Sequence, residues 1–238
     1  MITLYACGSP NVTKVLFMLA EVGLPYAYEH VSVVRAENCR PEFVALNPNG
    51  KVPVIVDDDG PSSEPHVVFE SVAILVYLAE KCGALIPTDT KKRSEMLQWL
   101  LVQAAYFGPM YGQARHFLAL APKEGNEYAR ERYTSEAYRL LDVLEARLSQ
   151  SPYVGYDEFS IADIAMYPGL EYHVQNTVNL GDRPNTDRWM KAMAQRPGWQ
   201  AAKATLEEIL AIDLEKSKGV TAEQMDRVFG RGRFARTC

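Results

Sequence analysis

The sequence predicts an α/β domain over residues 1–83, followed by an all-α domain over residues 89–212. Strand-like and helix-like patterns alternate before residue 83, whereas beyond residue 89 apolar residues recur almost only at helical spacing. The proline-containing segment Ala84–Asp89 separates the two parts. Residues 213–238, which include several arginines near the end, are expected to form a C-terminal extension.

The N-terminal domain is predicted from short apolar segments punctuated by glycine and proline. A strand–helix–strand order at its start favours parallel pairing through a right-handed crossover. A later pair of short strands around the turn at residues 57–60 favours a hairpin. The expected strands are 2–7, 26–33 and the two beside that turn, and the expected helices are 12–21, 41–46 and 69–81. This βαβ–ββα order is typical of a thioredoxin-like domain.

Five helices are predicted in the second domain from apolar periodicity and from proline and glycine breaks. Ser160 and Asp163 fit a capping box at the start of one helix, and we expect both to be structural. The expected helices are 91–120, 127–150, 161–175, 186–195 and 201–211.

Composition and charge exclude several classes of protein. A formal net charge of −5 argues against a nucleic-acid binder, which needs a basic surface. No apolar run approaches the roughly 18 residues needed to cross a bilayer, and we expect neither a membrane partner nor a secretory signal. The four cysteines are scattered without zinc-ligand spacing, so we expect no metal and a cytoplasmic location. Cys39, Cys82 and Cys238 are expected to be unpaired thiols.

One segment suggests a ligand. Pro53 lacks an N–H donor and must stand at a strand's first position or edge, which leaves the backbone of Val52 free to pair with an extended peptide. Glu70 and Ser71 stand where a helix begins, and the unpaired N–H groups there suit a carboxylate. A small peptide with a charged amine and a carboxylate, such as glutathione, fits this pattern.

These motifs and the buried SIADI box, in this order, resemble the cytosolic glutathione transferases over residues 2 to about 210. Within that superfamily, Ser9–Asn11 and residues 108–113 and 130–133 look most like the bacterial Nu class, which includes Ure2-like proteins and glutathione-dependent disulfide-bond reductases. The resemblance implies a homodimer that uses glutathione as cosubstrate. It also implies a set of glutathione-binding residues: Lys51, Val52, Pro53 (in the cis form), Glu70, Ser71, Asn38, Arg40 and Arg132, the last acting from the partner subunit.

The predicted chemistry lies in the first loop. A thiol with a pKa near 8.5 needs stabilisation of its anion to react at neutral pH. The start of the helix after Pro10 supplies N–H donors, and Ser9 and Asn11 are the candidate catalytic residues. A serine stands where redox relatives carry a cysteine, which favours activation of bound glutathione over a protein-cysteine mechanism.

A second-substrate pocket is expected on the first long helix, where Tyr106 and Met110 are spaced to share a face. Gln113 and Arg115 complete the candidate set. The favoured reaction is disulfide or peroxide reduction. The alternatives are conjugation or β-aryl ether cleavage of carbon electrophiles, and a non-catalytic, Ure2-like binding or regulatory protein.

Overall fold

The computed structural model describes residues 1–231 and divides the chain into two compact units. The first unit contains Met1–Leu78 and the chain from Pro197 onward, and the second contains Ala79–Arg196. The helix from residue 197 therefore packs with the N-terminal unit, although it follows the helical bundle in sequence. The domain limits at residues 83, 89 and 212 stay a prediction.

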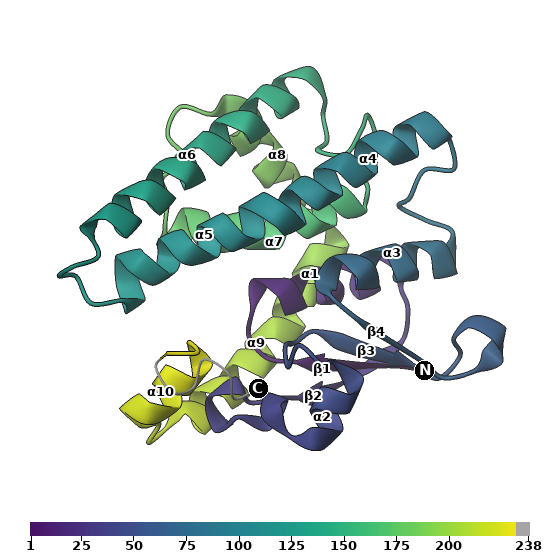
Figure 1. Ribbon diagram of the computed structural model, residues 1–238. Helices are drawn as coiled ribbons and strands as arrows, with labels where there is room; N and C mark the ends of the chain where they lie inside the picture. The colour runs from purple at the N-terminus through teal and green to yellow at the C-terminus, as the bar shows by residue number, and fades with distance from the viewer. Residues whose placement is uncertain (232–238) are drawn as a thin grey trace. The chain divides into compact units, whose positions relative to one another are not determined.

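The first unit is built on a four-stranded mixed sheet in the order β2-β1-β3-β4, with helices α1 and α3 on one face and α2 on the other (Figure 1). β1 and β2 are parallel, whereas β3 is antiparallel to both β1 and β4. This confirms the predicted crossover and hairpin. The strands are β1 (Ile2–Ala6), β2 (Tyr26–His30), β3 (Val54–Asp57) and β4 (His66–Phe69).

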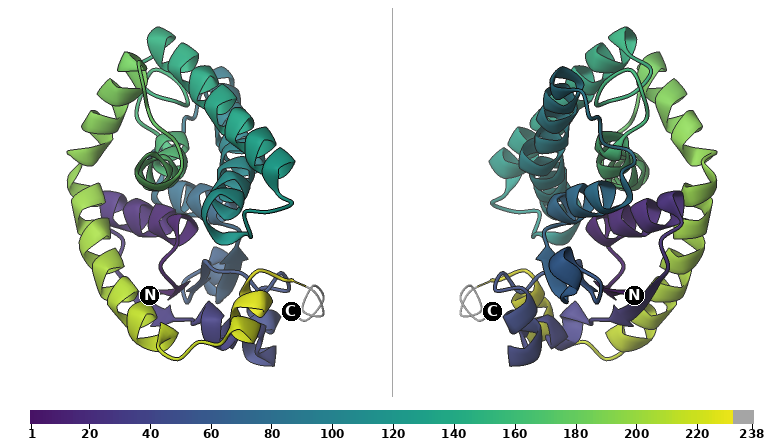
Figure 2. Two further views of the ribbon diagram at one scale, coloured as in Figure 1. Left: turned by 90° about the vertical axis from the view of Figure 1, so that its left-hand side faces the viewer. Right: turned by 90° about the vertical axis from the view of Figure 1, so that its right-hand side faces the viewer.

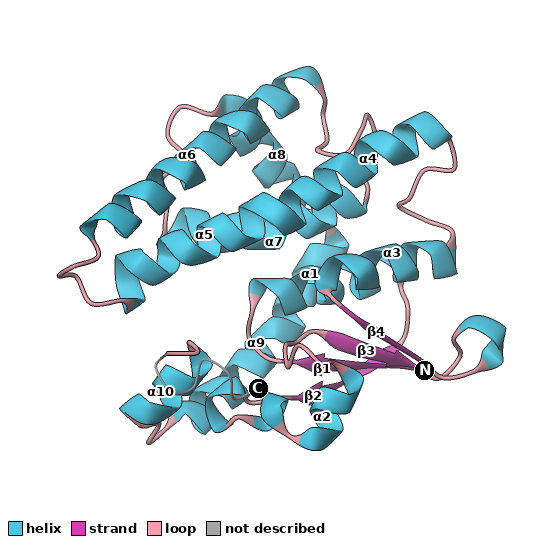
Figure 3. Ribbon diagram, viewed as in Figure 1, coloured by secondary structure: helices cyan, strands magenta, loops and turns pink. Residues whose placement is uncertain are grey.

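The helices of this unit connect and cover the sheet (Figure 3). The α-helices are α1 (Pro10–Val22), α2 (Pro41–Leu46), α3 (Ser71–Cys82), α9 (Pro197–Ser217) and α10 (Ala222–Val228). Short 3₁₀ turns are η1 (Val33–Arg35), η2 (Glu37–Cys39) and η3 (Pro61–Ser63). α9 extends six residues beyond its expected end at residue 211, and Thr221 caps a further helix within the expected extension.

α1 is buried on all sides over residues 12–19. α9 packs against α1, with Trp199 edge-on against Phe17 at a ring-centroid distance of 5.4 Å. Figure 2 shows α9 running alongside α1. Gly198 allows this approach, because a Cβ there would lie 2.8 Å from the Cα of Glu21.

The second unit is helical, as predicted. Its long first helix is interrupted by the π-helical turn η4 (Gln103–Phe107) and ends in a second one, η5 (His116–Leu120). The other helices are α4 (Thr90–Val102), α5 (Gly108–Arg115), α6 (Glu127–Gln150), α7 (Ile161–Asn176) and α8 (Pro184–Ala194). Ser160 and Asp163 form the predicted capping box of α7, and the buried Asp163 also accepts a bond from the Trp189 indole at 2.9 Å.

Candidate active site

The first loop ends in a capped helix. Ser9 is the N-cap of α1, where its Oγ accepts a hydrogen bond from the Val12 N–H at 3.3 Å. Its carbonyl accepts from the Thr13 hydroxyl at 2.9 Å. The Ser9 oxygen therefore takes part in capping, and the Ser9 side chain also hydrogen-bonds the neighbouring Cys7 thiol.

Asn11 lies in the first turn of α1, with an exposed side chain. Its Oδ1 accepts a hydrogen bond from Lys14 Nζ at 2.8 Å. This contact orients the amide, because an oxygen that accepts from an ammonium leaves the Nδ2 group as the outward donor. Asn11 can therefore donate to an anion beside the helix N-terminus, where the helix dipole also favours negative charge.

Lys14 is a functional candidate that sequence reasoning missed. Its side chain is only 2% exposed, and burial lowers its pKa to about 7, against the opposing effect of the nearby Glu70 carboxylate. A signal was present in the sequence, because Lys14 sits within an otherwise strongly apolar helix. Lys14 links the first loop electrostatically to the residue expected to hold the glutathione ammonium.

Glu70 and Ser71 form the corner between β4 and α3, as predicted. Glu70 is exposed and adopts the left-handed region, with φ of 68°, which turns the chain sharply into the helix. Ser71 is the first residue of α3 and is buried. The Glu70 carboxylate therefore lies beside the start of α3, where the first N–H groups of a helix have no partner within the helix.

The Val52–Pro53 peptide bond is cis, as predicted. The β3 ladder begins at Val54, which pairs with Tyr5 and Phe69, so Val52 lies just outside it. Val52 is half-buried and Lys51 is exposed.

Two weaker candidates differ in exposure. Asn38 is buried, and its Nδ2 donates to the Gly50 carbonyl at 2.9 Å, which braces the turn before Lys51. Arg40 is exposed and lies 3.7 Å from Glu37. Direct contact of either residue with glutathione stays a prediction.

Cysteine chemistry is disfavoured in the first loop. Cys7 is 6% exposed. Its burial, and to a smaller extent the charge of Asp213, raise the pKa of its thiol to about 12, although a hydrogen bond with Ser9 lowers it. A thiol of that pKa is almost fully protonated at neutral pH. Cys7 is a free cysteine. The expectation of an unpaired thiol is confirmed for Cys82 but is wrong for Cys39, which is disulfide-bonded. Cys238 lies outside the described residues.

The remaining candidates lie in the second unit. Tyr106 falls in the π-helical turn η4, so the α-helical spacing that related it to Met110 does not hold there. Tyr106 and Gln113 are exposed, whereas Met110 and Arg115 are half-buried. Arg132 is exposed and lies 3.6 Å from Glu136 on α6. The roles of these residues in binding stay predictions.

Two family models match the chain: the glutathione S-transferase N-terminal domain over residues 8–81, and the glutathione S-transferase C-terminal domain over residues 107–197. The chain belongs to the glutathione transferase family. It is 40% identical to the disulfide-bond oxidoreductase YfcG of Escherichia coli strain K12, over 83% of this chain and 92% of that protein.

Solved glutathione transferases are similar in both sequence and fold. One from Pseudomonas putida, with one glutathione disulfide bound per subunit, is 38% identical, with a TM-score of 0.80 over 84% of this chain and 90% of that one. Another, from Burkholderia graminis with two glutathione molecules bound per subunit, is 42% identical and has a TM-score of 0.80. The match covers 84% of this chain and 86% of that one. These values confirm the resemblance and the thioredoxin-like and helical fold classes.

Residues 1–231 bring no three histidine, cysteine or carboxylate side chains together in a metal-binding group. Within the same residues, no helix combines the length and apolar character that crossing a membrane requires.

Proposed function

We propose that this glutathione transferase activates the thiol of glutathione and uses the thiolate to reduce disulfides or peroxides. The observation that carries the proposal is the 2.8 Å contact of Lys14 Nζ with Asn11 Oδ1, which turns the amide donor outward at the start of α1. The similarity to a disulfide-bond oxidoreductase, and to transferases with bound glutathione disulfide or glutathione, supports this reaction class.

In this proposal, the tripeptide lies between the Val52 backbone and the start of α3. Val52 pairs with the cysteinyl unit, since it lies just outside the β3 ladder. The N–H groups at Ser71 bind the γ-glutamyl carboxylate, and Glu70 binds the ammonium. Lys51 approaches the glycyl carboxylate. This arrangement directs the glutathione sulfur toward Ser9 and Asn11.

The chemistry then follows from the thiolate. Hydrogen bonds from Asn11 Nδ2 and the Ser9 hydroxyl lower the thiol pKa, because they stabilise the anion more than the neutral thiol. The thiolate attacks one sulfur of a disulfide, forms a new S–S bond and displaces the other sulfur as a thiolate, which takes up a proton. A second glutathione thiolate attacks the mixed disulfide and releases glutathione disulfide and the second reduced thiol.

We further propose that two chains form a homodimer in which Arg132 reaches the glutathione bound to the partner subunit. Tyr106, Met110, Gln113 and Arg115 are the proposed lining of the second-substrate pocket. A reducing cytoplasm, where glutathione is kept reduced, is the proposed location.

Turnover by the wild type is compared with that of Asn11→Ala and Asn11→Asp. The substrates are a model disulfide, a hydroperoxide, an activated aryl chloride and a β-aryl ether, each with glutathione. The aspartate keeps the shape of the side chain and the contact with Lys14 but removes the amide donor. We expect both variants to lose about 10²-fold in kcat with the disulfide, since one donor to a reacting anion is worth about that much.

Each result assigns a function. Turnover confined to the aryl chloride or the β-aryl ether would replace reduction by the carbon-electrophile alternative. Glutathione binding without turnover in any assay would favour the non-catalytic alternative. Wild-type turnover by Asn11→Asp would refute the role of the amide donor.

A further inference from the structure

The end of α9 contacts the loop that carries Ser9. Alternate residues of β2 share one face of the strand, and each side chain on that face reaches a later position on α9. The pairs are Tyr26 with Thr205 at 3.3 Å, Tyr28 with Glu208 at 3.4 Å, and His30 with Asp213 at 2.9 Å. α9 thus follows β2 as far as the point where the first loop leaves β1.

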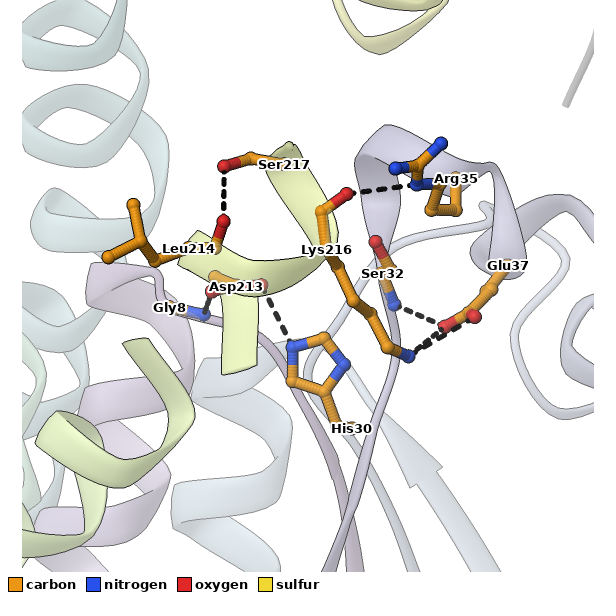
Figure 4. A network of polar contacts seen from close by, with 9 residues as sticks. All are labelled: Gly8, His30, Ser32, Arg35, Glu37, Asp213, Leu214, Lys216 and Ser217. Carbon is orange, nitrogen blue, oxygen red and sulfur yellow. Dashed lines mark hydrogen bonds and ion pairs between the residues drawn. The ribbon is translucent and has the colours of Figure 1, made fainter. Parts of the chain in front are cut away.

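Asp213 bridges β2 and the first loop through its two carboxylate oxygens (Figure 4). Oδ2 accepts a hydrogen bond from the Gly8 N–H at 2.6 Å, and Oδ1 lies 2.9 Å from His30 Nε2. Gly8 fits tightly, because a Cβ there would lie 2.7 Å from Asp213 Oδ2 and would overlap the Leu210 side chain. A short bond from a backbone N–H to a carboxylate is among the stronger hydrogen bonds in proteins.

We propose that Asp213 is a positioning residue for the catalytic loop, fixing Gly8 so that Ser9 and the start of α1 present their donors to the glutathione sulfur. This inference rests on the proposed function. Gly8 immediately precedes Ser9, which caps α1, so the carboxylate holds the loop one residue before the cap.

The negative charge of Asp213 does not itself favour a thiolate. It raises the pKa of the neighbouring Cys7 thiol, as it would that of any nearby thiol. The contribution of Asp213 is therefore geometric, and a neutral acceptor at this position should preserve it.

Other contacts hold the end of α9 in place independently of Asp213 (Figure 4). Lys216 Nζ lies 3.0 Å from a Glu37 carboxylate oxygen, and Glu37 in turn accepts from the Ser32 N–H at 2.7 Å. Arg35 donates to the carbonyls of Lys216 and Lys218 at 2.9 and 2.7 Å, which caps the helix C-terminus. Removing the Asp213 carboxylate therefore leaves α9 docked.

Three variants separate positioning from simple structural support. Asp213→Ala should lower kcat for the model disulfide about tenfold, with the KM for glutathione within about twofold, because the groups proposed to bind the tripeptide are untouched. Asp213→Asn retains an acceptor for Gly8 and should stay within about threefold of the wild-type kcat. Lys216→Ala, a matched change one turn away, should leave both constants within about twofold.

Two further readouts do not depend on turnover. The Gly8 amide proton should exchange with solvent about tenfold or more faster in Asp213→Ala than in the wild type, and should be unaffected in Lys216→Ala. The thiol pKa of bound glutathione, read from thiolate absorbance, should be higher in Asp213→Ala than in the wild type. It should not be higher in Asp213→Asn, which keeps the acceptor for Gly8 and removes the charge.

The positioning role would be overturned, while the proposed function stands, if Gly8 exchange in Asp213→Ala were the same as in the wild type. It would also be overturned if exchange were faster but kcat and the thiol pKa stayed at their wild-type values. Equal kcat losses in the Ala and Asn variants would also overturn it, since charge would then matter rather than geometry. A wild-type protein that does not lower the thiol pKa of bound glutathione would instead defeat the proposed function, and this inference with it.

Discussion

Replacing Lys14 by methionine should stabilise the protein while impairing its chemistry. Burial lowers the pKa of Lys14 from 10.5 to about 7. Each pKa unit corresponds to about 1.4 kcal/mol, so keeping this side chain fully protonated in the folded protein costs about 5 kcal/mol of stability. At pH 7, where about half of the folded molecules carry the proton, the cost is about 4 kcal/mol. Methionine has a similar length, no charge and enough flexibility to fill the site. Allowing for the lost contact with Asn11, we expect a gain of about 2–4 kcal/mol in the free energy of unfolding at pH 7.

The pH dependence gives a sharper signature. Between pH 7 and 10.5 the unfolded chain keeps the Lys14 proton while the folded protein loses it. Because the unfolded state binds more protons in this window, Lys14 makes wild-type stability rise with pH, and the difference between variant and wild type should shrink from pH 7 to 10. The same substitution should lower kcat, since Asn11 loses the donor that orients its amide.

Urea unfolding followed by circular dichroism at several values between pH 6.5 and 10 measures both effects. Lys51→Met is the matched stability control, because Lys51 is exposed and its loss should change stability by less than about 0.5 kcal/mol. A Lys14→Met protein that is less stable than the wild type at pH 7, or whose difference from it does not change with pH, would refute the reasoning.

Three further substitutions test separate parts of the structure. Cys7→Ala should keep wild-type disulfide turnover, because the buried thiol has a pKa of about 12, and a large loss of kcat would point to a protein-cysteine mechanism. Asp163→Ala should lower the free energy of unfolding by about 3 kcal/mol in thermal or urea denaturation, since it removes the capping box and the partner of the Trp189 indole. A change below about 1 kcal/mol would contradict this expectation. Gly8→Ala should destabilise the folded protein by about 1–3 kcal/mol and lower kcat, because the added methyl group would overlap Leu210. Wild-type stability together with wild-type kcat would show that the loop adjusts freely.

Local sequence patterns were sufficient to predict most of the strands and helices of the N-terminal unit. The alternation of Ile2–Ala6, the breaks around Gly8 and Pro25, and the turn after Asp57 each act over a few residues, and the strands and helices formed accordingly. Pro53 and the Glu70–Ser71 corner could be read in the same way, because proline and helix starts impose constraints that depend on near neighbours alone.

Long-range packing accounts for what the sequence did not reveal. α9 returns to cover α1, a helix whose buried residues include Lys14. Gly8 and Asp213 meet across 205 positions of sequence, and no local pattern marks such a pair. The π-helical turn at Gln103–Phe107 has no clear compositional signature either, so the helical spacing assumed for Tyr106 and Met110 could not be corrected beforehand.

The thiol pKa of bound glutathione shows directly whether Asn11 stabilises the thiolate. It is measured by titrating the ultraviolet absorbance of the thiolate in complexes of the wild type and Asn11→Asp, with free glutathione as reference. We expect a pKa at least about one unit below that of the free thiol in the wild type, and a value close to the free thiol in the variant. A wild-type pKa equal to that of free glutathione, or one lowered equally in both proteins, would contradict this expectation.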